Sequence, residues 1–417
     1  MWCLGREITT NGLFTIVENL NIDCPPTYPP GCKVVFVGEA PGKEEVYAKE
    51  GFVGPVGKCL QRACGLAGIE WLQVGRTNVA KRRPPDNKFK EAFYETVEEP
   101  IYTKTGKLSK VAKKIVRPTE EYLQWVSALR SELQVSHPNL IVACGNEALE
   151  ALTGQSGITD YRGSILPDKW GDNLKVLAVE HPSYIIRGNL ADFWILVHDL
   201  KKAKREMEFP KIQRESYIIY PNPDLDLVLG FLARLAAHND IKWTLDIETR
   251  AGTLACFAIA FIWPGCASPT TFCIPIQTTS GPYWSLDDEL EIWRALYETT
   301  RANSLLCNQN IEYDIDYLLR YGIEPSGVYL DTMLAHSILY PEFPKSLAFL
   351  CSFYLDDVVY YKWMGSDQTT GYTKDEELWE RCCKDALYTL RIVDKIDKEL
   401  KRRGLYEFYH TNSEKIC

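Results

Sequence analysis

The sequence has no CxxC pair, and no apolar run reaches the roughly 18 to 20 residues that a membrane-spanning helix needs. Its 14 cysteines are scattered, and the adjacent Cys382 and Cys383 suit a disulfide framework poorly. The opening residues, MWCLGREITT, lack the basic and apolar regions of a secretion signal. We therefore expect reduced, buried cysteines, no zinc site, no membrane partner and a cytoplasmic location.

The charge distribution differs between the two halves of the chain. The 417 residues carry a net charge of −9, with 46% hydrophobic and 25% charged residues, which is ordinary for a globular protein of two or three domains. Residues 1–220 hold 29 Lys and Arg against 27 Asp and Glu, whereas the remainder holds 18 against 29. The acidic half therefore has no attraction for nucleic acid of its own, although bound divalent cations would invert its local field.

Strand-like and helix-like patterns alternate from residue 33 onward. KVVFVGEAPG is typical of a buried strand that ends in a Gly-Pro loop, and VGKCLQRACGLAGI of the helix behind it. NLIVACGNEALEALTG repeats the strand, turn and helix, and LKVLAVEHPSYIIRG adds another strand and loop. This order predicts an α/β fold with a parallel sheet flanked by helices, and functional sites at the carboxyl ends of its strands.

Two charged stretches interrupt this alternation. Residues 87–118 form a charged insertion, in which IYTKTGKLSKV is expected to fold as an exposed hairpin. KKAKREMEFPKIQRES is a charged helix end followed by a proline, and it is the best candidate for a linker. We therefore expect domains at 1–208 and 217–417, joined by a linker at 209–216.

Acidic side chains from three separated segments mark a candidate site in the second half. In WTLDIETR, Asp246 and Glu248 would point to the same face of a strand. Asn310 and Asp314 are four residues apart on a predicted helix, and Asp385 lies on another amphipathic helix. A lone DxE pair most often has one carboxylate in solvent and the other beside Lys or Arg. Four acidic groups from three elements would instead converge on one site.

This set resembles the proofreading 3′–5′ exonuclease domain of family A DNA polymerases over about residues 215–410. The resemblance implies a ribonuclease H-like domain with a mixed sheet, which hydrolyses phosphodiester bonds at single-stranded 3′ ends of DNA. Hard oxygen ligands favour Mg²⁺ or Mn²⁺, and two such ions are expected. The resemblance assigns Asn310 to the DNA end and four carboxylates to the metal ions: Asp246, Glu248, Asp314 and Asp385.

The third exonuclease motif departs from the family pattern. That motif reads YxxxD or HxxxD, and its Tyr or His orients the attacking water, but Arg381 stands four residues before Asp385 here. A permanently charged guanidinium cannot act as a general base, so slowed hydrolysis is expected. Tyr388, one turn beyond Asp385, is a weaker candidate for the missing role.

Five short segments in the first half resemble family 4 uracil-DNA glycosylases over about residues 31–200. They are GEAPG, EGFVGPVGKCL, TNVAKRRPPDNK, YRGSI and HPSYIIRG, in this order between residues 38 and 188. Each alone has an ordinary alternative, such as a tight turn, a solvated basic face or a core phenylalanine, but their order and spacing are specific. The resemblance implies a domain that flips a uracil nucleotide out of DNA and cleaves off its base.

The resemblance also implies roles in a uracil pocket. Phe52 would stack on uracil, and the Asn78 amide would bond the pyrimidine edge. His181 would bond the uracil oxygen that gains charge as the C–N bond breaks. The backbone from Gly38 to Ala40 would line the pocket.

Charged side chains around the pocket are assigned to the sugar and to the rest of the DNA. Glu39 or Glu45 would steady the sugar cation or the attacking water. Basic side chains would bind the DNA backbone. They are Lys81, Arg82, Arg83, Arg162 and Arg187.

The four cysteines that bind an iron–sulfur cluster in family 4 glycosylases are not kept in this chain. Cys3 and Cys24 are far apart, and Arg82 and about Trp125 stand where the family has the other two. Because neither arginine nor tryptophan replaces a thiolate ligand, no cluster is expected, and loop packing would take over its structural role.

A glycosylase-like domain followed by this exonuclease resembles the front end of certain bacteriophage DNA polymerases. No segment matches a polymerase palm, so a separate polymerase chain is an expected partner alongside uracil-containing DNA. We expect a DNA-processing protein of phage-type replication, with proofreading exonuclease activity and uracil recognition or excision. Two alternatives stay open: a non-catalytic DNA-holding or processivity module, and a uracil-DNA glycosylase with an inactive exonuclease domain.

Overall fold

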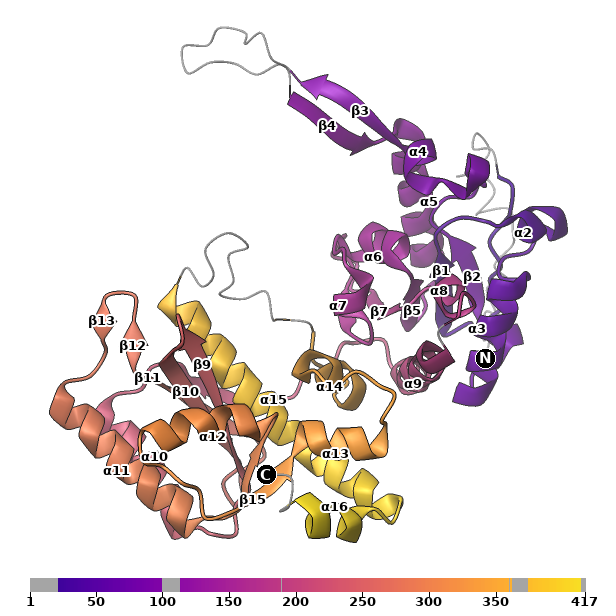
Figure 1. The fold of residues 1–417 in the computed structure, drawn as a ribbon. Coiled ribbons are helices and arrows are strands. Elements are labelled where there is room, and N and C mark those ends of the chain that lie inside the picture. Colours follow the sequence, from indigo (N-terminus) through magenta and orange to yellow (C-terminus); the bar gives the residue numbers. More distant parts are fainter. Residues whose placement is uncertain (1–21, 100–112, 189, 360, 362–373, 414–417) are drawn as a thin grey trace, which may run out of the picture. The chain divides into compact units, whose positions relative to one another are not determined.

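The chain folds into two α/β units, shown in Figure 1 as a computed structural model that describes residues 22–99, 113–188, 190–359, 361 and 374–413. The first unit ends at Ile212 and the second begins at Gln213. This division falls inside the stretch expected to form a linker. Among the described residues, the helices are too short or too polar to cross a lipid bilayer. The expected α/β class with two domains is confirmed.

The first unit is built on a five-stranded, mostly parallel sheet. Its strands are β1 (Val34–Gly38), β2 (Gly75–Asn78), β5 (Leu140–Cys144), β6 (Ile165–Pro167) and β7 (Lys175–Val179). They lie in the order β2-β1-β5-β7-β6, and only β6 runs antiparallel to its neighbour. The parallel sheet expected from the alternating pattern is therefore present, with one antiparallel edge strand.

Helices cover both faces of this sheet (Figure 1). The α-helices are α2 (Lys43–Ala48), α3 (Pro55–Ala67), α4 (Phe89–Phe93), α5 (Glu120–Ser136), α6 (Asn146–Thr153), α7 (Ile158–Tyr161), α8 (Pro182–Ile185) and α9 (Leu190–Glu206), and short 3₁₀ turns span Trp71–Gln73 and Pro85–Asn87. Val34 and Phe36 of β1 pack with α3 and α9, whereas Val35 and Val37 pack with α5. Burial on both faces explains why β1 is apolar throughout.

A two-stranded antiparallel ribbon extends from this unit (Figure 1). It consists of β3 (Tyr94–Glu99) and β4 (Lys113–Pro118) and lies within the charged insertion. The turn expected within IYTKTGKLSKV lies outside the described residues.

The second unit has a six-stranded mixed sheet. Its strands are β8 (Ile218–Tyr220), β9 (Trp243–Arg250), β10 (Thr253–Phe261), β11 (Thr270–Pro275), β14 (Leu306–Asn308) and β15 (Val328–Asp331), while β12 (Gln277–Thr278) and β13 (Gly281–Pro282) form a separate ribbon. The order is β15-β14-β9-β10-β11-β8. β9, β10 and β11 form an antiparallel meander, to which the other strands add in parallel pairs. The expected mixed sheet is therefore present.

The α-helices of this unit are α10 (Leu225–Ala237), α11 (Leu286–Ala302), α12 (Ile311–Arg320), α13 (Thr332–Leu339), α14 (Leu347–Tyr354), α15 (Asp375–Arg402) and α16 (Tyr406–Ser413).

Side-chain alternation along β9 sets the two faces of this sheet. Trp243, Leu245 and Ile247 of β9 enter an apolar core with α10 and α11. The alternate residue Thr244 donates from Oγ1 to the Ala386 carbonyl of α15 at 2.7 Å. The intervening positions of β9 therefore face α15.

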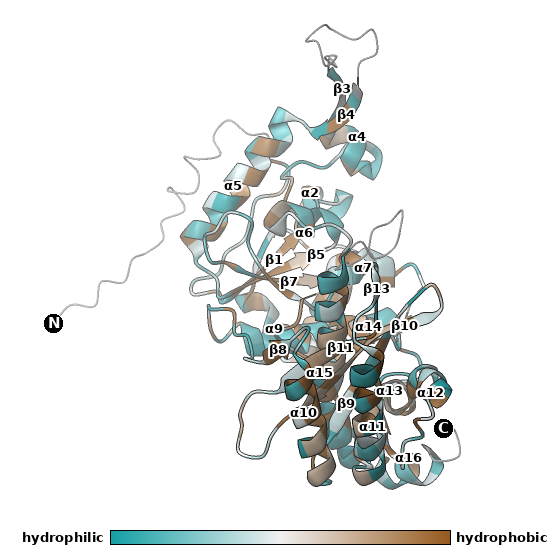
Figure 2. Ribbon diagram, turned by 90° about the vertical axis from the view of Figure 1, so that its left-hand side faces the viewer, coloured by the Kyte–Doolittle hydropathy of each residue, from teal (hydrophilic) through white to brown (hydrophobic). Residues whose placement is uncertain are grey.

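Hydropathy along the helices matches this layering. In Figure 2, α5 and α11 carry teal, hydrophilic residues along their lengths, whereas β1 is brown. These two helices therefore keep a polar side in water, while their apolar residues pack in the cores of their units.

Candidate functional site

Three carboxylates meet between β9 and α15. Asp246 and Glu248 come from the face of β9 that α15 covers, and Asp385 projects from α15 itself. Carboxylate oxygens of the three residues lie within 4.8 Å of one another. Glu248 and Asp385 are 8% and 2% exposed, and Asp246 is half-buried. Because carboxylates this close and this dry repel one another, the cluster needs positive charge.

Arg381 supplies part of that charge by binding Glu248. Its Nη2 and Nε both donate to Glu248 Oε1, at 2.6 and 2.9 Å. The two side chains are only 12% and 10% exposed. The sequence indicates that Arg381 cannot act as a base, and the structure adds that it contacts a predicted metal ligand.

Tyr361 belongs to this site, although no sequence pattern indicates it. Its hydroxyl donates to Asp385 Oδ1. Burial, and then the charge of Asp385, raise the pKa of Tyr361 well above its ordinary value, so the hydroxyl stays a donor. Tyr388, the candidate from sequence, packs its ring on Tyr361 with 5.0 Å between centroids. Tyr361 lies 24 residues from Asp385, too far for a spacing rule within one helix to find it.

Asp314 is not among the three carboxylates that lie within 4.8 Å of one another, and its role as a fourth metal ligand stays a prediction. Its Oδ1 accepts the backbone N–H of Ile247 at 3.0 Å, and its Oδ2 accepts the amide of Asn308 at 2.9 Å. Burial, with smaller contributions from the Asp331 and Glu248 charges, raises its pKa well above the ordinary value, against the lowering effect of these hydrogen bonds. Asp314 therefore joins α12 to β9 and β14.

Asn310 begins α12 as its N-cap. It is half-buried and has a φ of 63°, a left-handed conformation that asparagine tolerates better than most residues. Asp331 accepts the N–H groups of Ile311 and Leu334 at 2.7 and 2.9 Å, which fixes the start of α12 against α13. The role of Asn310 at the DNA end stays a prediction.

The carboxyl ends of β1 and β2 bring three predicted uracil-pocket residues together. Gly38 and Asn78 are paired across the two strands. A Cβ atom at Gly38 would lie 2.4 Å from Asn78 Oδ1 and 3.1 Å from Phe52 Cζ, so glycine is needed for both side chains to fit. They therefore meet at the sheet edge where α/β proteins bind ligands.

Glu45 holds the loop that carries Phe52. Its Oε1 accepts the Phe52 N–H at 2.5 Å, and its Oε2 accepts the Gly42 N–H at 2.7 Å. Phe52 has a φ of 60°, which is unfavourable for a bulky residue and requires support from its surroundings. Glu45 thus positions the Phe52 backbone. Glu39 is the other acid predicted to steady the sugar cation or the attacking water.

Burial sets the charge state of Glu39. It raises the pKa to about 7, with a further increase from the Glu147 charge and an opposing effect of Lys90. Glu39 is half-buried directly after β1. Its charge therefore changes near neutral pH.

His181 stands between β7 and α8. Its Nδ1 accepts the Ser183 N–H at 3.3 Å and lies 2.7 Å from the Ser183 hydroxyl. Burial, and to a smaller extent the Arg187 charge, lower its pKa to about 4, so the ring is neutral near pH 7. With Nδ1 as the acceptor, the ring proton is assigned to Nε2, which makes that atom a donor.

Two of the predicted DNA-backbone contacts lie in the interior instead. Lys81 is 1% exposed and donates to Glu132 at 2.9 Å and to the Asn78 carbonyl at 2.7 Å. Arg162 is 6% exposed and donates to Asp199 at 2.7 Å. Burying a cation requires a paired anion, and these partners hold both cations inside the fold.

The other predicted basic contacts lie nearer the surface. Arg83 is half-buried, and its Nε and Nη2 each donate to Asn87 Oδ1 at 3.1 Å. Arg187 is exposed and donates from Nε to the Ser183 carbonyl at 2.9 Å. Ala40, assigned to the pocket wall, is half-buried after Glu39.

Arg82 and Trp125, which the resemblance places at about the positions of two cluster cysteines, make other contacts. Arg82 Nε and Nη2 donate to the two Glu121 oxygens at 2.9 Å each, and its guanidinium lies 5.3 Å from the Phe93 ring centroid. Trp125 is fully buried. Within the described part of this unit, no three His, Cys, Asp or Glu side chains converge, and Cys3 lies outside it. The residues present do not fit an iron–sulfur cluster.

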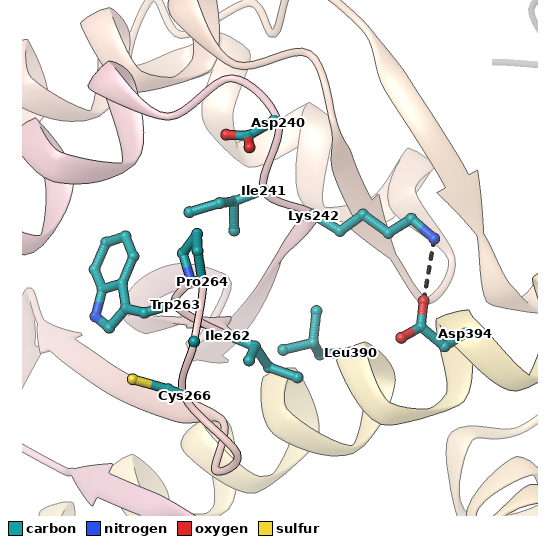
Figure 3. Close-up of a pocket in the computed structure, with 10 residues that line it drawn as sticks. Asp240, Ile241, Lys242, Ile262, Trp263, Pro264, Cys266, Leu390 and Asp394 are labelled. Carbon is teal, nitrogen blue, oxygen red and sulfur yellow. Dashed lines mark hydrogen bonds and ion pairs between the residues drawn. The ribbon is translucent and has the colours of Figure 1, made fainter.

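A separate cavity of about 420 Å³ opens at the start of β9 (Figure 3). It lies between Lys242, the β10–β11 connection around Trp263, and Leu390 and Asp394 of α15. Lys242 Nζ donates to Asp394 at 3.1 Å across one side of it. None of its lining residues belongs to the carboxylate cluster, so we assign it no part in that site.

The uracil DNA glycosylase superfamily matches residues 25–202. The type-4 uracil-DNA glycosylase of Thermotoga maritima is 31% identical over 206 residues, which cover 48% of this chain and 88% of that protein. The chain belongs to the type-4 uracil-DNA glycosylase family. The matched range of this glycosylase-family chain contains Gly38, Phe52, Asn78 and His181.

The second unit of this type-4 family member matches the 3′–5′ exonuclease family at residues 266–401, a range that begins after β9. DNA polymerase I of a Synechocystis species is 30% identical over 179 residues, 41% of this chain and 18% of that protein. The structure of Brucella melitensis NrnC bound to pGG has 20% identity and a TM-score of 0.31, covering 46% of this chain and 86% of its own. The two family matches show that the chain joins a glycosylase domain to a 3′–5′ exonuclease domain.

Replacing Gly57 with Ala should displace Phe52. The added Cβ would lie 1.7 Å from the Phe52 carbonyl oxygen, so the loop must move. We expect binding of uracil-containing DNA to weaken by about 1–3 kcal/mol, the usual contribution of one base–aromatic stack. Fluorescence anisotropy with uracil and thymine strands measures this loss.

Gly65→Ala is the matched control, because it lies on the same helix and has open space around its added Cβ. It should leave uracil binding unchanged and raise stability by at most about 1 kcal/mol. Equal uracil affinity in Gly57→Ala and Gly65→Ala would contradict the assignment of Phe52 to the pocket.

Proposed function

We propose that the second unit is a metal-dependent exonuclease that removes nucleotides from single-stranded 3′ ends of DNA. The observation that carries this proposal is the convergence of Asp246, Glu248 and Asp385 within 4.8 Å. The 3′–5′ exonuclease family match supports the reaction class. Proofreading within phage-type replication, beside a separate polymerase chain, is the setting we propose for this activity.

The carboxylate cluster fits a hard divalent cation. Its donors are oxygens, which favour Mg²⁺ or Mn²⁺ over softer metals, and Asp246, Glu248 and Asp385 would hold the ion. A bound divalent cation stabilises the charge that develops on the oxygens of a phosphodiester during hydrolysis. The protein's contribution is to hold these carboxylates in place: β9 fixes two of them, and the hydrogen bond from Tyr361 orients Asp385.

We also propose that the first unit recognises and excises uracil. This second function is favoured by the meeting of Asn78 and Phe52 around Gly38 and by the neutral His181. Phe52 would stack on the flipped base while the Asn78 amide binds its edge. His181 Nε2–H would donate to the uracil oxygen that becomes negative as the C–N bond breaks, and the Glu39 carboxylate would steady the sugar cation or the water.

Two alternative functions, each with one of the two activities missing, compete with these proposals. The Arg381–Glu248 ion pair favours a chain whose exonuclease is inactive and whose glycosylase alone acts. The loss of the cluster cysteines favours a module that holds DNA without excising uracil. Parallel assays of 3′ trimming and of uracil release on the same preparation separate these readings.

Asp246→Asn should abolish 3′ trimming and leave uracil release intact, because only the carboxylate cluster loses a ligand. The loss should exceed the about 10- to 100-fold that follows removal of a group supporting a metal ligand. Shortening of a 5′-labelled single strand, with Mg²⁺ and with EDTA, measures it. Asp316→Asn, exposed on α12, is the control. Trimming that survives Asp246→Asn or EDTA would rule out this site.

Tyr361→Phe should slow 3′ trimming by about 10- to 100-fold, because Asp385 loses the hydrogen bond that orients it. The phenyl ring keeps the packing with Tyr388, so the melting temperature should change little. Tyr297→Phe, which removes a hydroxyl exposed on α11, should trim like the wild type. If the two variants behave alike, Tyr361 has no part in the reaction.

Uracil release should become faster as pH rises through about 7, because Glu39 then becomes a carboxylate. His181, with a pKa of about 4, stays neutral across this range and should not contribute to the slope. Single-turnover release from a uracil-containing strand, measured between about pH 5.5 and about pH 8.5, gives the profile. In Glu39→Gln the rise near pH 7 should disappear; a profile that keeps it assigns the ionisation to another group.

A further inference from the structure

Three cysteines of the second unit lie with their sulfur atoms together. Cys256, Cys273 and Cys382 are each fully buried, and their Sγ atoms lie within 4.8 Å of one another. They come from β10, β11 and α15, so the absence of CxxC pairs from the sequence does not exclude this cluster. A single buried cysteine packs as a small apolar side chain, whereas three adjacent sulfur atoms form a set of soft donors.

The register of the sheet turns the two strand cysteines toward α15. Cys256 pairs with Glu248 across β10 and β9, so both side chains lie on the face that α15 covers. On β11, Thr271 Oγ1 donates to the Cys383 carbonyl of α15 at 3.2 Å, and Cys273 follows two residues later on the same face. The strand register that gathers the carboxylates therefore gathers these thiols as well.

The helix α15 brings the third thiol to this face. It packs against β9, β10 and β11 (Figure 1). Cys382 donates from Sγ to the Asp246 backbone carbonyl at 3.4 Å, which places its sulfur atom beside the sheet. The thiol cluster therefore lies next to the carboxylate cluster but shares none of its members.

The spacing of the sulfur atoms suits one metal ion. A zinc–thiolate bond is about 2.3 Å long, and three sulfur atoms in a plane around an ion at that distance lie about 4.0 Å apart. The observed separations reach at most 4.8 Å. Small rotations of the side chains are therefore enough to bring all three sulfur atoms onto one ion.

The ligand set selects the kind of ion. Among the described residues, no fourth His, Cys, Asp or Glu side chain joins the three thiols at this distance. Structural zinc sites almost always have four ligands in a tetrahedron, whereas the soft ion Cu(I) is stable with two or three sulfur ligands. Each thiol that binds as a thiolate releases its proton to solvent, and no electron is transferred. Three buried sulfur donors therefore favour Cu(I) over Zn²⁺ and over the hard ions Mg²⁺ and Mn²⁺.

We propose that Cys256, Cys273 and Cys382 form a second metal site, which binds one soft monovalent ion such as Cu(I). This site goes beyond the exonuclease and uracil functions and does not depend on either. Its three ligands join α15 to β10 and β11, so a bound ion holds the helix on the sheet. Because only the folded chain gathers the three sulfur atoms, binding stabilises the second unit.

Retention of copper by the full chain tests this proposal without reference to activity. Because the sulfur atoms are fully buried, the ion enters during folding or when α15 opens locally, so the chain is loaded in both ways. It is purified from cells grown with added copper, and the reduced, metal-free chain is titrated with Cu(I) under anaerobic conditions. Bicinchoninate, a coloured Cu(I) chelator, then removes weakly bound ions. The wild type should keep one Cu(I) per chain, with three sulfur neighbours in its X-ray absorption spectrum and a raised melting temperature.

Single variants show whether the retained ion lies in the thiol cluster. Cys273→Ala removes one donor and should lose the retained ion. Cys307→Ala, at another fully buried cysteine of the same unit, is the matched control and should keep it. Cys266→Ala removes an exposed thiol and should also keep it.

Three results would overturn the proposal: no copper retained by either route, a copper count that Cys273→Ala leaves unchanged, or retention of Zn²⁺ but not of Cu(I). If Cys273→Ala does not fold, the number of sulfur neighbours around the copper of the wild type decides. Three sulfur neighbours support the cluster, and fewer than two overturn it.

Discussion

Core packing around β9 forces carboxylates together that would otherwise repel one another. Because side chains alternate along a strand, the register that buries Trp243 and Leu245 under α10 and α11 also turns Asp246 and Glu248 toward α15. A one-residue slip would separate the acids from Asp385 only by moving the apolar residues to the wrong face. The apolar core thus maintains an electrostatically unfavourable cluster, and the rest of the site follows from how that cluster is neutralised.

Sequence patterns predicted the parts of the structure that depend on local spacing. The two-residue spacing of Asp246 and Glu248 fixes their common face, and strand ends place Gly38 beside Asn78. The contacts of Tyr361 with Asp385, and of Arg381 with Glu248, are set by distances across the fold that spacing does not encode. A run of basic residues has the same limitation, because it does not reveal which of its members turns inward.

Lys81 illustrates that limitation. It lies next to two arginines in TNVAKRRPPDNK, a basic segment expected to contact the DNA backbone, yet its ammonium is held in the interior by Glu132 and by the Asn78 carbonyl. Its buried partner Glu132 is 51 residues away in the chain, so the local sequence does not show that Lys81 turns inward. Lys81 therefore bonds the backbone of Asn78, a residue of the proposed uracil pocket, and its ammonium is not exposed to a phosphate.

Arg82 and Trp125 contribute unequally to holding the first unit together. The Arg82–Glu121 pair is 26% and 37% exposed, and ion pairs that open to water contribute only about 0–1 kcal/mol. Trp125 is fully buried, and a buried apolar side chain contributes about 1.5–3 kcal/mol or more. Of these two residues, Trp125 therefore contributes more to the stability of the first unit, through its packing. The Arg381–Glu248 pair of the second unit is more shielded, at 12% and 10% exposure, and removing one partner of a shielded pair leaves an unmatched charge that costs stability.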